Sequence, residues 1–363
     1  MKEVAIKDIC KKDSSALKQK ELLPEGKYPV FGASGIAGYL DRYHQKKEYI
    51  GIVKDGSGIG RVAFYPAESS LIGTMQYVLP KENYDIRYIG YCLQSLDLSK
   101  YKQGAAIPHI YFRDYGEQLV KVTDNWEEQH SIVSRLDSAF SHIDALKANA
   151  EKQLNEARKL FQAELTECMK PKEGWEEKKL GEVCDFEGGS QPPKSEWINH
   201  PQDGYVRMLQ IRDFTRSRNA EIEYVKISKK IRLCKADDIL IGRYGASVGK
   251  ILTGLAGAYN VAIIKSIPNE ELISKAFIKR YFEARSFQSV LFKVCASRAA
   301  QAGFSKDDIC DTPIPVPPLS EQHRIVSHLD SLSSTIRKLE ELQQKTIAEC
   351  DALKQAMLRE VFE

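Results

Sequence analysis

The sequence has no long apolar run. No window approaches the roughly 18 consecutive apolar residues of a membrane-spanning helix, and the opening residues Met1–Ala5 form no apolar signal core. We therefore expect a soluble cytoplasmic protein. Neither sign of charge is in large excess: 53 Lys and Arg face 50 Asp and Glu, a net charge of +3. This total neither requires nor excludes a polyanionic partner.

Closely spaced cysteines are also missing. The chain has eight cysteines, and no two of them form a CxxC motif. This spacing argues against a structural zinc site, and we expect no metal ligands in this chain. In a cytoplasmic protein of this size, the cysteines are most simply reduced and partly buried.

The chain lacks the common catalytic motifs. It has no GxSxG, HExxH or P-loop sequence, no recognisable carboxylate dyad, and no Asn/Asp-Pro-Pro-aromatic motif of amino-methyltransferases. The glycines Gly56, Gly58 and Gly60 lack the GxGxxG spacing, and strand-like residues follow them, which favours a tight hairpin turn over a nucleotide site. We expect no catalytic residue and no cofactor bound by this chain.

What the chain does contain is an internal repeat. The segment Glu128–Glu167 recurs 193 residues later as Glu321–Glu360, with 19 of 40 positions identical and no gap. His130 and His323 occupy the same position of the two copies, which favours a capping or packing role over catalysis. Neither copy contains Gly or Pro, and each predicts a helix of about 40 residues, roughly 60 Å long.

Each predicted helix has an apolar stripe with a period of 3.5 residues, which is typical of a coiled coil. Asn125 or Asp124 could cap the first helix, and Ser320 the second. We expect the two helices to pair as an antiparallel coiled coil; the alternative is two helices that each pack on their own domain. The predicted seam residues are Leu136, Ile143, Leu146 and Leu160 in the first helix and Leu329, Leu332, Ile336, Leu339 and Leu353 in the second.

The segments before the helices also correspond, more faintly. Ile52–Val62 resembles Ile241–Ile251, and both predict strand, glycine turn and strand. We expect an α+β protein with two mixed α/β domains that alternate with the two helices, related by a pseudo-two-fold axis. The predicted boundaries are 1–124 for the first domain, 125–170 for the central helix, 171–319 for the second domain and 320–363 for the C-terminal helix.

Basic residues concentrate in the second domain: residues 207–250 hold eleven basic and five acidic side chains. Such a segment suits phosphates, while Arg and Gln also suit base edges in the major groove. Two diverged basic domains joined by a pseudo-two-fold rod predict a bipartite, asymmetric DNA target. The candidate DNA-binding residues are Lys54, Ser57, Arg61, His109, Gln191, Arg207, Gln210, Arg212, Arg243, Tyr244, Ser247, Lys250 and Arg298.

The sequence resembles the specificity subunit of type I restriction–modification systems. The resemblance is carried by Pro313–Val326 at the approach to the second helix, by the internal copy Glu128–His130, by the turn segment Ile241–Lys250, and by the start of the second domain, Gly174–Val183. It covers essentially the whole chain.

The resemblance implies two target-recognition domains, each reading one half of a split DNA site. It implies that the helices set the spacer and dock two methylation subunits, which modify adenine with S-adenosylmethionine. A restriction subunit, where one exists, would add ATP- and Mg²⁺-dependent translocation and cleavage. The chain itself would be non-catalytic. The alternatives are a coiled-coil adaptor whose globular ends bind protein partners, and a nuclease that acts alone.

Overall fold

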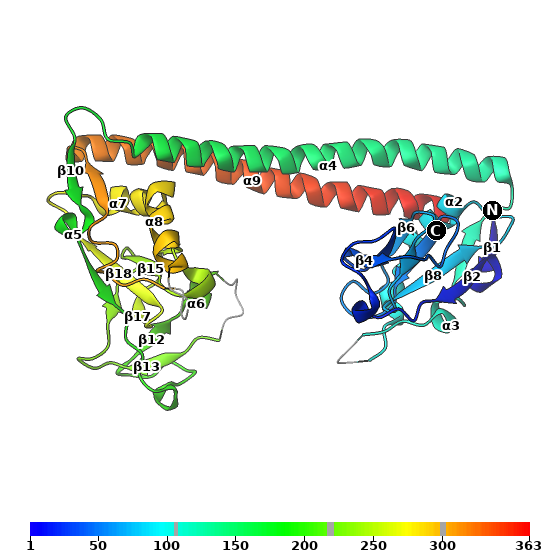
Figure 1. Ribbon diagram of the computed structural model, residues 1–363, viewed down its shortest axis with the longest axis horizontal. Coiled ribbons are helices and arrows are strands. Elements are labelled where there is room, and N and C mark those ends of the chain that lie inside the picture. The colour runs from blue at the N-terminus through cyan, green and yellow to red at the C-terminus, as the bar shows by residue number, and fades with distance from the viewer. Residues whose placement is uncertain (105–107, 216–220, 298–302) are drawn as a thin grey trace. The chain divides into compact units, whose positions relative to one another are not determined.

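The computed structural model describes residues 1–104, 108–215, 221–297 and 303–363. Within these residues the chain forms two compact units (Figure 1). Unit 1 consists of residues 1–152 and 342–363, and unit 2 of residues 153–341. Each unit therefore contains one globular domain together with part of each long helix. The candidate residue Arg298 lies outside the described residues.

Unit 1 begins with a mixed α/β domain built on a four-stranded antiparallel sheet in the order β2-β8-β5-β6. A three-stranded sheet, β4-β3-β7, and a two-stranded sheet, β1-β9, complete it. The elements are β1 (Lys2–Ala5), α1 (Ile6–Ile9), β2 (Cys10–Ser14), β3 (Tyr28–Gly32), β4 (Gly35–Leu40), β5 (Tyr49–Val53), β6 (Val62–Tyr65), β7 (Ser70–Leu71), β8 (Met75–Pro80), α2 (Ile86–Ser95), α3 (Phe112–Tyr115) and β9 (Leu119–Val122), with short 3-10 turns at Gln19–Glu21 and Leu98–Tyr101.

Unit 2 repeats this plan. Its sheets are β11-β18-β15-β16, β13-β12-β17-β14 and β10-β19. The elements are β10 (Glu176–Lys179), α5 (Leu180–Val183), β11 (Cys184–Gly188), β12 (Tyr205–Leu209), α6 (Ile211–Thr215), β13 (Tyr224–Lys226), β14 (Leu233–Cys234), β15 (Ile239–Gly242), β16 (Ile251–Leu252), β17 (Gly257–Tyr259), β18 (Ile263–Pro268), α7 (Lys275–Glu283), α8 (Arg285–Ala296) and β19 (Pro313–Val316), with 3-10 turns at Lys194–Glu196 and Gly245–Ser247.

The repeat therefore extends from the helices to the sheets of the two domains, although the second sheet has three strands in unit 1 and four in unit 2. The segments β5–turn–β6 and β15–turn–β16 are both antiparallel pairs, which confirms the predicted strand, glycine turn and strand. The approach to each long helix is a strand, β9 or β19, paired with the first strand of its own unit. Strand β19 contains Pro313 and Pro315, which have no N–H donor, and a two-stranded sheet tolerates such residues because both of its strands are edges. Ile314 and Val316 of the same strand are buried in the core.

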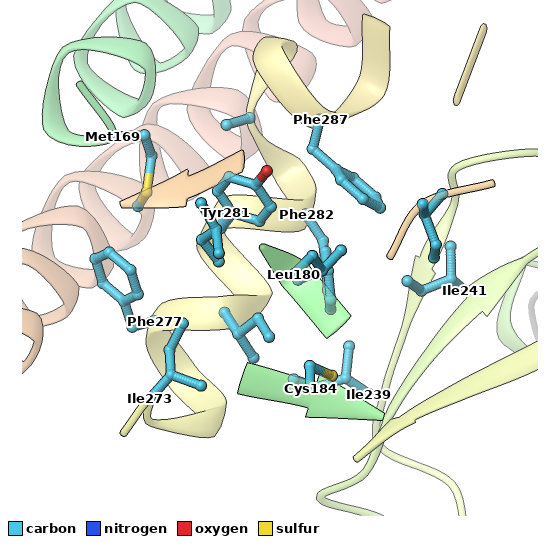
Figure 2. Close-up of a cluster of buried hydrophobic side chains, with 14 of the residues drawn as sticks. Met169, Leu180, Cys184, Ile239, Ile241, Ile273, Phe277, Tyr281, Phe282 and Phe287 are labelled. Carbon is cyan, nitrogen blue, oxygen red and sulfur yellow. The ribbon is translucent and has the colours of Figure 1, made fainter. Parts of the chain in front are cut away.

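The core of unit 2 lies between the sheet β11-β18-β15-β16 and helix α7 (Figure 2). Phe277, Tyr281 and Phe282 of α7 and Phe287 of α8 are almost fully buried there. Met169, which directly follows the central helix, joins the same cluster. The corresponding core of unit 1 joins its sheet and α2 to both long helices, and Tyr88 lies 5.2 Å from Phe362 between ring centroids. Each domain is therefore fastened to its helical segments by apolar packing.

The two long helices are α4 (Trp126–Cys168) and α9 (Leu319–Phe362). Asn125 caps α4 through its side chain, which accepts a hydrogen bond from the Glu128 N–H at 3.1 Å. The expected cap at Ser320 is wrong, because α9 begins one residue earlier and places Ser320 inside the first turn. None of the helices in the described residues has an apolar stretch long enough to cross a membrane.

Within each unit the segments of α4 and α9 run antiparallel. In unit 1 Lys147 pairs with Asp351 at 2.8 Å and Asp144 with Lys354 at 2.5 Å. In unit 2 Arg158 pairs with Glu340 at 2.7 Å. The pairs Lys147–Asp351 and Arg158–Glu340 are related by the 193-residue repeat, so equivalent positions make equivalent contacts.

The predicted seam is correct at some positions and wrong at others. Leu136, Ile143 and Leu329 are buried, and Leu332, Ile336 and Leu339 are half-buried. Leu146, Leu160 and Leu353, in contrast, are 59%, 61% and 52% exposed. Near the first two, the side chains that turn inward are Lys147 and Phe161, one residue further along. The inward positions keep a seven-residue repeat, with Phe140, Lys147, Leu154 and Phe161 seven residues apart. The spacing from Leu136 is four then three residues, whereas the prediction took three then four and so placed this half of the seam one residue too early.

Candidate nucleic-acid interface

The turn between β5 and β6 positions three of the candidate residues in unit 1. Gly56, Gly58 and Gly60 have φ angles of 82°, 83° and 83°, a region that favours glycine. Lys54 begins this turn, Ser57 lies exposed near its middle, and Arg61 ends it, donating from Nη2 to the Ala33 carbonyl at 2.6 Å.

His109 joins this turn from a distant part of the chain. A β-bridge pairs Asp55 with His109, and the His109 ring contacts the Asp55 carboxylate. The Ile110 N–H also donates to the Lys54 carbonyl at 2.9 Å. Partial burial, together with the nearby charge of Lys54, lowers the pKa of His109, and burial lowers the pKa of Lys54. These lowered pKa values favour the neutral form of His109, so Lys54 and Arg61 are the cations of this turn.

Two residues that were not among the sequence candidates extend this surface. The ring of Tyr111 lies 4.1 Å from that of His109, and the Arg113 guanidinium lies 4.5 Å from the Tyr111 ring centroid. The Arg113 side chain is 73% exposed. A cation stacked on an exposed aromatic ring suits contacts with phosphates and bases. The sequence signal was the run His109–Arg113, in which two basic residues flank Ile110, Tyr111 and Phe112.

The equivalent turn of unit 2 lies between β15 and β16. Arg243 occupies the position that Lys54 has in unit 1, and Lys250 occupies that of Arg61. Arg243 donates from Nε to the Phe304 carbonyl at 3.1 Å, and its guanidinium lies 5.1 Å from the Tyr244 ring centroid. Ser247 is half-buried in this turn and Lys250 is exposed. The structure thus brings together Arg243, Tyr244, Ser247 and Lys250.

Three other candidates in unit 2 belong to an internal polar network centred on two carboxylates. Arg212 and Gln210 donate to Glu223 at 2.5 and 2.9 Å, and Lys194 pairs with the same carboxylate. Burial alone would raise the pKa of Glu223, but hydrogen bonds from Lys194 and Gln210 and the charges of Lys194 and Arg212 hold it below its usual value.

Arg207 pairs with the second carboxylate of this network, Asp213. It donates from Nη2 to Asp213 at 2.7 Å, and the Asp213 side chain is only 3% exposed. The Nε atoms of Arg207 and Arg212 are buried. Arg207 and Arg212, two of the eleven basic residues between 207 and 250, are therefore neutralised by carboxylates of the same domain.

Gln191 lies apart from this network, in a hollow of about 410 Å³. Lys226 and Lys230 line the same hollow beside Pro192 and Pro193. The β15–β16 turn and this hollow therefore both carry basic side chains in unit 2.

Comparison with known proteins places this geometry in a family. Residues 1–156 and 172–348 match the model of the type I restriction modification DNA specificity domain. The chain is 24% identical over 268 residues to the EcoR124I/EcoR124II specificity subunit of Escherichia coli. This alignment covers 70% of this chain and 65% of that subunit. It is 25% identical over 194 residues to the MjaVIII specificity subunit of Methanocaldococcus jannaschii, covering 53% of this chain and 44% of that subunit.

The chain thus spans less than two thirds of the length of these curated relatives. A solved structure, from a study of complex assembly and conformational transition of the type I R-M system, shares the fold with a TM-score of 0.75 at 18% identity, covering 98% of this chain and 96% of that one. Because the family model matches both halves of the repeat, the chain belongs to the family of type I restriction modification DNA specificity domains.

Proposed function

We propose that this chain is the DNA sequence-specificity subunit of a type I restriction–modification complex, and that each domain reads one half of a bipartite, asymmetric site. The observation that carries the proposal is the recurrence of a cation at one structural position of both units, Lys54 and Arg243, at a turn bridged to a second loop. The surroundings differ, with Asp55 and His109 in one unit and Tyr244 and Gly303 in the other. Two related but different surfaces suit two different half-sites.

The long helices would set the spacing between the half-sites by pairing along their length as an antiparallel coiled coil. The repeat-related ion pairs Lys147–Asp351 and Arg158–Glu340 support this arrangement. Two methylation subunits would dock on the helices, joined by restriction subunits where the system has them. S-adenosylmethionine, ATP and Mg²⁺ would bind to those partners, and this chain would contribute no catalytic residue.

The experiment is single-molecule detection of methylated adenine in the source genome, with and without this gene. We expect one split motif to lose its methylation on deletion and to regain it when the gene is restored. Unchanged methylation in cells that express the methylation subunits would overturn the proposal.

A binding assay separates this function from that of a protein-binding adaptor. Affinity for DNA falls with rising salt for any basic protein, because the released counterions depend on charge alone. A specificity subunit in complex with its methylation subunits must also discriminate between DNA sequences, by roughly a thousandfold or more. Equal affinity for the split motif and for scrambled DNA would favour the adaptor.

A further inference from the structure

Three side chains with metal-binding atoms meet where α4 and α9 lie against each other in unit 2. Glu164 and Cys168 lie one turn apart on α4, and His328 comes from α9. His328 Nε2 lies 2.9 Å from Glu164 Oε1, and Cys168 Sγ lies 3.8 Å from the same oxygen. The ligand atoms of all three residues lie within 4.8 Å of one another, and no other group in the described part of the chain has this arrangement.

The donor set is that of zinc. A thiolate, an imidazole and a carboxylate are the three ligand types that Zn²⁺ takes, whereas Ca²⁺ and Mg²⁺ prefer oxygen alone. The usual zinc–ligand bond lengths place tetrahedral ligand atoms roughly 3.3–3.7 Å apart, so small side-chain rotations would suffice here. Three protein ligands leave the fourth position for water.

The burial of these side chains suits an ion that enters from solvent. Cys168 is 8% exposed and forms the base of the site. The side chains of His328 and Glu164 are 55% and 39% exposed and form its rim. A bound ion would therefore be held by a sheltered sulfur and reached past two more accessible ligands.

The neighbouring cations are held elsewhere. Arg324 makes two hydrogen bonds to Glu321, at 2.6 and 2.8 Å. Lys172 lies 5.4 Å from the Trp175 ring centroid. Neither the Arg324 guanidinium nor the Lys172 ammonium hydrogen-bonds to Glu164, Cys168 or His328.

The repeat supplies an internal comparison. The positions equivalent to Glu164, Cys168 and His328 in unit 1 are Met357, Val361 and Arg135, which line an open groove of about 490 Å³. A thioether, an alkyl group and a guanidinium do not form a zinc site. The two halves therefore differ in chemistry at one equivalent place, and only unit 2 has the ligands.

We propose that Glu164, Cys168 and His328 bind one Zn²⁺, or a divalent transition metal of similar preference, and so join α4 to α9 within unit 2. The Cys168 thiol would release its proton to solvent when the sulfur binds the ion. Since the ligands lie far apart in sequence, the site exists only in the folded chain, and binding stabilises that fold. The inference does not depend on the proposed function.

The test is titration of the metal-free, reduced full-length chain with Co²⁺, followed by displacement with Zn²⁺. We expect one ion per chain and the near-ultraviolet charge-transfer absorption of a thiolate–cobalt bond. Cys168→Ser should abolish this absorption, and His328→Gln and Glu164→Gln should each weaken binding by about tenfold or more. Cys310→Ser, which removes a partly accessible thiol outside the site, should leave the absorption unchanged.

Thermal unfolding gives a second readout. Zn²⁺ at about 100 times its dissociation constant should raise the melting temperature of the wild type by roughly 5–10 °C and leave that of Cys168→Ser unchanged. If Cys168→Ser fails to fold, His328→Gln takes its place, because the His328 side chain is mostly exposed. The absence of binding, or absorption that survives both variants, would overturn the proposal.

Discussion

Gln129 and Gln322, 193 residues apart, make the same three hydrogen bonds in their respective units. Gln322 donates to the Leu272 and Pro317 carbonyls at 2.8 and 2.9 Å and accepts from the Ser274 N–H at 2.8 Å. Gln129 donates to the carbonyls of Asn83 and Thr123 and accepts from the Asp85 N–H. Both glutamines are fully buried, so each one locks the start of a long helix to the loop that leads into α2 or α7.

Replacing either glutamine should therefore lower the stability of the folded chain. Gln322→Ala would leave two carbonyls and one N–H unpaired in a buried position, and we expect the free energy of unfolding to fall by about 2–4 kcal/mol. Urea unfolding followed by circular dichroism measures this change. Gln344→Ala, at an exposed position of the same helix, should shift stability by less than about 0.5 kcal/mol. A similar effect of both substitutions would contradict the locking role.

Leu329 and Leu353 share the apolar repeat of α9 but differ in burial. Leu329 is fully buried, whereas Leu353 is 52% exposed. We expect Leu329→Ala to destabilise the protein by about 2–4 kcal/mol, through lost apolar contact and a cavity, and Leu353→Ala by less than about 1 kcal/mol. Thermal and urea unfolding of the two variants test this difference. Equal losses would mean that Leu353 is buried in the free protein.

Stability should depend on pH through Glu223. Its pKa in the folded chain lies below the usual 4.5, so the unfolded chain takes up the proton first as pH falls. The stabilising contribution is therefore present above pH 4.5 and is lost as pH falls through the lower folded pKa. We expect Glu223→Gln to lower stability at pH 7 by about 1–2 kcal/mol, and this deficit to shrink below pH 4.5.

The measurement is the difference in unfolding free energy between wild type and variant from pH 7 to pH 3. Glu221→Gln, at an exposed position two residues away, serves as the control and should show little deficit at any pH. A deficit for Glu223→Gln that does not change with pH would argue against the charged network.

The two turn cations should act on different half-sites. The protein is tested in the complex with its methylation subunits. We expect Arg243→Ala to weaken binding about tenfold to DNA that retains only the half-site read by unit 2. We expect Lys54→Ala to weaken binding about tenfold to DNA that retains only the half-site read by unit 1. Fluorescence anisotropy with each half-site scrambled in turn measures the effects. Lys229→Ala, at an exposed position, should change affinity little. Loss at both half-sites from one substitution would contradict the assignment.

Much of the architecture could be predicted without coordinates. The 193-residue repeat and the absence of Gly and Pro from both copies predict two long helices, and α4 and α9 match that prediction within two residues at each end. The glycine turns after Val53 and Gly242 were also predictable, because glycine is the residue that adopts their positive φ angles at low cost. These features depend on local backbone preferences and on a pattern repeated over many residues.

The surface chemistry could not be predicted in the same way. Arg207 and Arg212 are basic in the sequence, but Asp213 and Glu223 neutralise them once β12, β13 and α6 pack together. The ligands Glu164 and His328 are 164 residues apart and meet through helix packing. Local propensity and periodicity depend on residues that are close together in the sequence, so the sequence alone shows them. Charge pairing and ligand geometry act through space, so folding alone determines which side chains remain available.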